Sequence, residues 1–161
     1  MRKFHLLAGA LVLAFALAAV GGAAARSQAN TIRIAAAMTA ANETPAPKGD
    51  VSAARGTFTA TLTKSGTGAT LSWRLEFSNL SGNAIAAHIH VAAHIHSGVR
   101  GKSGPVIVPL CAPCKSGARG RATVDASVLN ALESGRTYVN VHTKKNAAGE
   151  IRGQLPAVPL T

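Results

Sequence analysis

The fold follows from Gly56-Thr-Phe-Thr-Ala-Thr-Leu-Thr63, then Ser65-Gly-Thr-Gly68, then Ala69-Thr-Leu-Ser-Trp-Arg-Leu-Glu-Phe77. Threonine alternates with other residues in the first run, and in the second the large apolar residues occupy the odd positions from Leu71 to Phe77. Side chains two apart lie on one face of a strand, so the odd-numbered face is predicted to be core. The glycines between the runs suit the positive φ of a tight turn. The stretch therefore predicts a β-hairpin with one buried and one polar face.

The same alternation recurs along the chain, in short runs separated by Gly, Ser, Asn and Pro. Strands are predicted near 31–39, 56–63, 69–78, 84–91, 105–109, 120–125, 137–142 and 149–155. Helical spacing occurs at 125–134, where Asp125 or Ser127 suits the N-cap and Gly135 the stop. This order predicts an all-β protein, an antiparallel Greek-key β-sandwich or barrel with one short helix.

The first 25 residues have the three parts of a secretory signal peptide. Arg2 and Lys3 precede an apolar run of 15 residues, Leu6–Val20, and small residues follow. The run is shorter than the roughly 20 residues of a membrane-spanning helix. We expect cleavage after Ala25, or alternatively after Ala29, which leaves a domain at 30–155, a tail at 156–161 and a periplasmic or secreted protein without a transmembrane segment.

The chain is strongly cationic, with 17 Lys and Arg against 6 Asp and Glu and a formal charge of +11. Removal of the leader with Arg2 and Lys3 would leave +9. No Asp or Glu lies between Glu76 and Asp125. Aromatic residues make up only 4% and no helix-turn-helix spacing occurs, so we predict no nucleic-acid partner. The preferred interpretation is a solvated basic surface that keeps the protein soluble or loosely attracts anionic polysaccharide or lipid.

A tandem repeat carries the most informative residues, Ala86-Ala-His-Ile-His-Val91 followed by Ala92-Ala-His-Ile-His-Ser97. In an extended chain each His-Ile-His presents two imidazoles on one face while its Ile faces the other. A third source is Tyr138-Val-Asn-Val-His142, in which the histidine also leaves the non-core face. The candidate metal ligands are His88, His90, His94, His96 and His142.

Imidazole ligands without a nearby carboxylate favour copper, zinc or nickel over Ca²⁺ or Mg²⁺. His90 and His94 would lie about 13 Å apart on a straight strand and could not share an ion. We therefore expect one pair to join His142 in an ordered copper or zinc site and the other pair to extend into a loop. From the residues alone, either pair fits.

Cys111-Ala-Pro-Cys114 lies in a loop between predicted strands. A local disulfide is the prediction in an oxidising compartment, with thiolate metal ligation and a redox pair as alternatives. Glu150 is either an outer hydrogen-bond partner of a ligating imidazole or an ion-pair partner of Arg152 or a lysine. No catalytic residue is predicted, because the sequence shows no Ser-His-Asp order, paired acids or phosphate-binding loop.

Several motifs in order resemble the chordin-like (CHRD) domain family: Asn42-Glu-Thr-Pro45, Leu80-Ser-Gly82, the Ala-Ala-His-Ile-His unit, Gly98–Leu110, Tyr138–Thr143 with Asn146, and Gly149–Gln154. The resemblance covers about 30–155 and implies an immunoglobulin-like or superoxide-dismutase-like fold of the kind found in secreted bacterial proteins and chordin. The family pattern has a single His-x-His. Counting forward from Leu80 assigns His88 and His90 to it, whereas counting back from Gly98 assigns His94 and His96.

The functional prediction is a metal-binding protein that holds copper or zinc through one His-x-His pair and His142. The alternative is a non-enzymatic module that binds an extracellular protein or an anionic polysaccharide. A remote similarity to copper,zinc superoxide dismutases leaves a dismutase-like redox enzyme as a further alternative, but no counterpart of the zinc subsite is found, so we expect no enzymatic activity.

Overall fold

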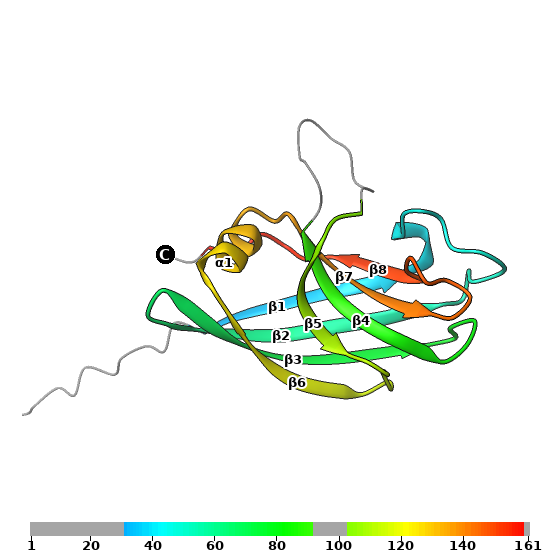
Figure 1. The fold of residues 1–161 in the computed structure, drawn as a ribbon, viewed down its shortest axis with the longest axis horizontal. Helices are drawn as coiled ribbons and strands as arrows, with labels where there is room; N and C mark the ends of the chain where they lie inside the picture. Colours follow the sequence, from blue (N-terminus) through cyan, green and yellow to red (C-terminus); the bar gives the residue numbers. More distant parts are fainter. Residues whose placement is uncertain (1–30, 92–102, 160–161) are drawn as a thin grey trace, which may run out of the picture.

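The computed structural model of the protein describes residues 31–91 and 103–159 (Figure 1). The predicted signal peptide, His94 and His96 lie outside the described residues. The described part contains β1 (Thr31–Thr39), the 3₁₀ turn η1 (Ala40–Asn42), β2 (Arg55–Ser65), β3 (Gly68–Ser78), β4 (Ala84–Val91), β5 (Val106–Cys111), β6 (Ala118–Val124), α1 (Ala126–Glu133), β7 (Thr137–Thr143) and β8 (Ile151–Gln154). Each predicted strand therefore has a counterpart, and the bounds differ by a few residues.

The strands form one antiparallel sheet in the order β5-β4-β7-β8-β1-β2-β3-β6. β1, β2 and β3 are consecutive neighbours, β3 also pairs with β6, and β8 lies beside β1. The sheet curls until its terminal strands β5 and β6 come into contact, which gives a nearly closed barrel around the core (Figure 1). The all-β antiparallel prediction with one short helix is confirmed.

The β2–β3 hairpin has the predicted turn and the predicted core face. Ser65 pairs with Gly68, and Gly66 takes the positive φ of +59°. Leu71 and Leu75 are fully buried and Trp73 is 7% exposed. Trp73 lies opposite Gly120 of β6, where an added Cβ would stand 2.5 Å from the indole ring. A glycine on the edge strand therefore makes room for the chain's single tryptophan.

The helix α1 forms where its sequence spacing and cap predict it. The Asp125 carboxylate accepts a hydrogen bond from the Val128 backbone N–H at 3.0 Å, and Gly135 follows the helix with φ +62°. Val128, Leu129 and Leu132 are buried in the core. No helix among the described residues is long and apolar enough to cross a membrane.

Candidate metal centre

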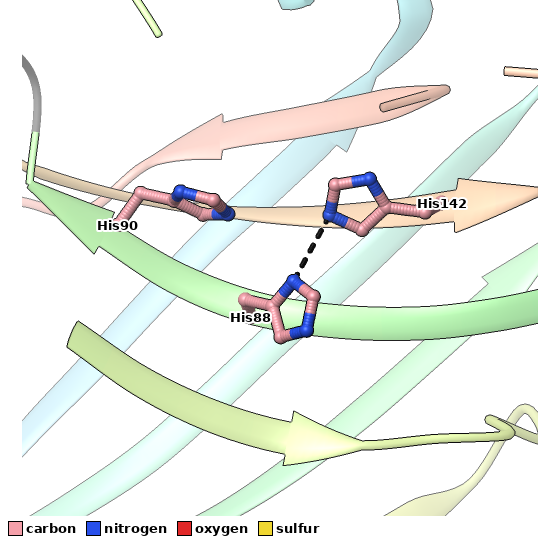
Figure 2. Close-up of side chains that lie close together, drawn as sticks. All are labelled: His88, His90 and His142. Carbon is pink, nitrogen blue, oxygen red and sulfur yellow. Dashed lines mark hydrogen bonds between the residues drawn. The ribbon is translucent and has the colours of Figure 1, made fainter. Parts of the chain in front are cut away.

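Three of the predicted ligands meet on neighbouring strands, His88 and His90 from β4 and His142 from β7 (Figure 2). Ile89 of β4 and Val141 of β7 are buried in the core, so the histidines leave the opposite face of the sheet. Ala86 is the residue directly opposite His142. Its small side chain leaves room for His142 to contact the diagonal neighbour His88.

The three imidazoles form a cluster in which one pair already has the separation needed to bind one ion. Nδ1 of His88 and Nε2 of His142 lie 3.1 Å apart, and one ligand nitrogen from each histidine lies within 4.8 Å of the others. Two nitrogens that bind one ion at about 2.0–2.1 Å are about 2.9 Å apart at a right angle and about 3.4 Å apart at the tetrahedral angle. His88 and His142 therefore already have chelating separation, and Figure 2 shows a nitrogen of His90 facing the same space.

Hydrogen bonds to backbone carbonyls determine which ring nitrogen of His90 and of His142 is free to bind a metal ion. Nδ1 of His90 lies 2.8 Å from the carbonyl oxygen of Gly104, and Nδ1 of His142 lies 3.0 Å from that of Ala147. A carbonyl only accepts, so each Nδ1 carries the hydrogen and each Nε2 presents a lone pair. Among the described residues, Nε2 of His90 is buried and has no partner at hydrogen-bond geometry, although the neighbouring Asn140 side chain acts to raise the His90 pKa against burial. Metal-bound histidines are commonly held by such an outer hydrogen bond.

The pKa values of all three histidines lie below the usual range. Burial is the largest cause for His142, and the neighbouring charges of His88 and His90 add to it, so its pKa falls to about 4 despite the opposing hydrogen bond to Ala147. Burial also lowers the pKa of His88 and of His90. The imidazoles are thus neutral at neutral pH, the form that binds a metal ion.

A layer of buried polar side chains surrounds His90. The ring of Tyr138 stacks on His90 with centroids 4.9 Å apart, and the Arg152 guanidinium lies 3.3 Å from the Tyr138 centroid. Glu43, which is 5% exposed, accepts from the Asn140 amide and lies 4.0 Å from Arg152. Burial raises the pKa of Glu43 against these interactions. Sequence reasoning missed Glu43 as the acid beside Arg152, although it belongs to the Asn-Glu-Thr-Pro motif.

Glu150 has a different role from either one predicted. It is fully buried and accepts hydrogen bonds from Ser81, from the Thr143 hydroxyl at 2.6 Å and from the Asn146 amide at 2.9 Å. Burial acts to raise its pKa, but these hydrogen bonds outweigh burial and lower it. Glu150 therefore joins the loop before β4 to the β7–β8 connection, and within residues 31–91 and 103–159 no imidazole or cation is bonded to it.

The cysteines form the predicted local disulfide between Cys111, at the end of β5, and Cys114. Their sulfurs are bonded to each other, so neither is a thiolate ligand or a free redox thiol in this structure. The described residues thus bring together His88, His90 and His142 of the five candidate ligands.

Comparison with known proteins gives one family. The CHRD domain matches residues 34–155. This range contains β4 and β7, which carry the histidine cluster, and all the other strands apart from the first three residues of β1. No curated protein and no solved structure matches the chain. Because the match spans well over half of the 161 residues, the chain belongs to the CHRD domain family.

Proposed function

We propose that this CHRD domain binds a copper or zinc ion through His88, His90 and His142. The observation that carries the proposal is Nε2 of His90, a buried nitrogen that has no hydrogen-bond partner among the described residues and belongs to a three-histidine cluster. A buried polar atom left without a partner is destabilising by about 1–3 kcal/mol, and a metal ion would satisfy it. His142 Nε2 and one nitrogen of His88 complete the ligand set.

The ligand chemistry selects the metal class. Three neutral imidazoles suit copper and zinc, whereas Ca²⁺ and Mg²⁺ prefer oxygen ligands. The nearby carboxylate of Glu43 is engaged by the Thr44 N–H and the Asn140 amide. For equal geometry Cu²⁺ binds more tightly than Zn²⁺, so we expect copper to displace zinc in competition.

Binding or sequestration, rather than turnover, is the role we infer. The polar side chains beside the cluster are held in structural contacts, with Tyr138 between His90 and Arg152 and its hydroxyl bound by the Gly104 N–H. We place this role in the periplasm or outside the cell. The disulfide, the family match and the leader-like first 25 residues support that compartment.

Calorimetric titration of the protein with Cu²⁺ and Zn²⁺ tests the proposal. We expect His142→Ala, and separately the double variant His88→Ala/His90→Ala, to weaken binding more than about 100-fold, since loss of an outer hydrogen-bond partner alone weakens metal sites about 10–100-fold. The matched control is His94→Ala/His96→Ala, which removes the same residue types from the second copy of the repeat. Binding that survives in the first two variants, or that falls equally in the control, contradicts the proposed ligand set.

Electron paramagnetic resonance of the Cu²⁺-loaded protein provides a second measurement. Three imidazole ligands predict nitrogen hyperfine structure that loses one contribution in His142→Ala and is unchanged in the control. A spectrum dominated by oxygen ligands would place the ion elsewhere on the protein.

A further inference from the structure

The outer face of strands β1, β2, β3 and β6 is exposed and has an unusual composition. These strands lie side by side in the sheet (Figure 1). Their core-facing residues alternate with residues that are exposed or half-buried. The outward residues are Thr31, Arg33, Ala35, Ala37, Thr39, Arg55, Thr57, Thr59, Thr61, Thr63, Ser65, Gly68, Thr70, Ser72, Arg74, Glu76, Ser78, Arg119, Arg121 and Thr123. No apolar residue larger than alanine is among them.

The strand register arranges hydroxyls between arginines. One row across the sheet reads Arg33, Thr61, Ser72, Arg121, because each residue is paired with the next. Three strand spacings separate its two arginines, about 14 Å. The adjacent row ends in Arg74 and Arg119.

Both rows border a hollow. It has a volume of about 520 Å³ and is lined by Arg33, Thr59, Thr61, Ser72, Arg74 and Arg119, among others. The arginines and hydroxyls of this face therefore converge on a surface with room for a ligand.

The face carries a clear excess of positive charge. It holds five arginines and one acid, Glu76, which leaves a net charge of +4. Glu76 forms an ion pair with Arg74. Among residues 31–91 and 103–159, no carboxylate lies within ion-pair distance of Arg33, Arg119 or Arg121. These guanidinium groups are available to an anion in solution.

We propose that this arginine–threonine face binds a linear anionic polysaccharide. Guanidinium groups recognise carboxylate and sulfate through paired hydrogen bonds, and the intervening hydroxyls can hydrogen-bond sugar hydroxyls. The exposed rows of hydroxyls between guanidinium groups suit an extended chain with regularly repeated charges. A membrane surface fits less well, because the face offers no large apolar side chain to insert.

This site is separate from the histidine cluster, which lies on β4 and β7. It is also more specific than the cationic stretch seen in the sequence. Arg33, Arg55 and Arg74 lie outside or at the edge of the acid-free region, and pairing of the strands brings them onto one face with Arg119 and Arg121.

Affinity chromatography and calorimetry with dextran sulfate and polygalacturonate test the inference, with uncharged dextran as the ligand control. The face variant is Arg33→Gln/Arg119→Gln/Arg121→Gln. The matched protein control is Lys115→Gln/Arg136→Gln/Lys144→Gln, which removes the same net charge from exposed positions elsewhere. All six positions are exposed, and circular dichroism with thermal unfolding checks that both variants fold.

We expect the face variant to bind either polyanion about tenfold more weakly and to elute at lower salt, while the control variant keeps most of its affinity. Copper and zinc titrations should be unchanged in both. Equal losses in the two variants would show that net charge alone is responsible and would overturn the inference. So would absent binding to both polyanions, or a face-dependent preference for phosphatidylserine vesicles or duplex DNA.

Discussion

Acidification of the metal-free protein should destabilise it through His142. The pKa of this imidazole is about 4 in the folded protein because it is buried beside two other histidines, whereas an exposed histidine in the unfolded chain has a pKa of about 6.5. Between these values the unfolded state binds more protons than the folded state. The free energy of unfolding is therefore fully retained above about pH 6.5 and falls as the pH drops toward 4.

The size of the effect follows from the gap between the two pKa values. A difference of about 2.5 units corresponds to a total of roughly 3 kcal/mol, of which about 2 kcal/mol is lost between pH 7.5 and pH 5. A typical domain has only about 5–15 kcal/mol of stability, so the loss is readily measured. The lowered pKa values of His88 and His90 act in the same direction.

Urea unfolding in the presence of a chelator, at pH 7.5 and pH 5, measures this loss in the original protein and in His142→Asn. Asparagine does not titrate, and its amide offers a donor toward the Ala147 carbonyl that binds Nδ1 of His142. Between pH 7.5 and pH 5 we expect the free energy of unfolding to fall by about 2 kcal/mol more in the original protein than in the variant. The contributions of the other titrating groups are common to both proteins and cancel in this comparison. Equal losses would refute the conclusion that the fold keeps His142 neutral.

Two substitutions test the packing that supports the sheet. Gly120→Ala should lower the free energy of unfolding by about 1–3 kcal/mol because its Cβ would meet the Trp73 ring at 2.5 Å, whereas Gly82→Ala, with open space around it, should change it by less than about 0.5 kcal/mol. Glu150→Gln should lower the free energy of unfolding by about 2–3 kcal/mol. The substitution replaces one carboxylate oxygen, which accepts hydrogen bonds, by an amide NH₂ group that would face the donors of Ser81, Thr143 and Asn146. Urea unfolding at neutral pH measures both, and an unchanged midpoint in either would contradict the corresponding contact.

Strands β1, β2 and β3 were predictable because one face of each is buried and the other is largely not. Strict alternation in β3 determined which residues face the core, and only tertiary contacts could shift the boundaries. The last strand shows such a shift: it begins at Ile151 instead of Gly149. Gly149 has a φ of +135° and lies against Glu43, so the chain there turns into the strand instead of pairing along it.

The geometry around the histidines was beyond sequence reasoning because long-range contacts create it. The alternation of apolar and polar residues placed His88, His90 and His142 on the non-core face of the sheet. Such a face is usually exposed to solvent, yet His90 and His142 are each only 8% exposed. The groups that orient them are backbone carbonyls of Gly104 and Ala147, which have no signature in a sequence. Both carbonyls belong to segments outside the strands, which strand periodicity does not place.

The tandem repeat presented a choice between two His-x-His pairs, and an anchor upstream of β4 explains which one faces β7. Ser81 is bound through its backbone N–H and its hydroxyl to Glu150, in the connection between β7 and β8. From this anchor the chain reaches Ala84, opposite Thr143, after two intervening residues, and the pairing then brings His88 and His90 onto the face that carries His142. For the second copy to occupy those positions, six more residues would have to fit between Ser81 and the start of the strand. The forward count from Leu80-Ser-Gly82 is thus favoured because a buried carboxylate sets the register of the strand.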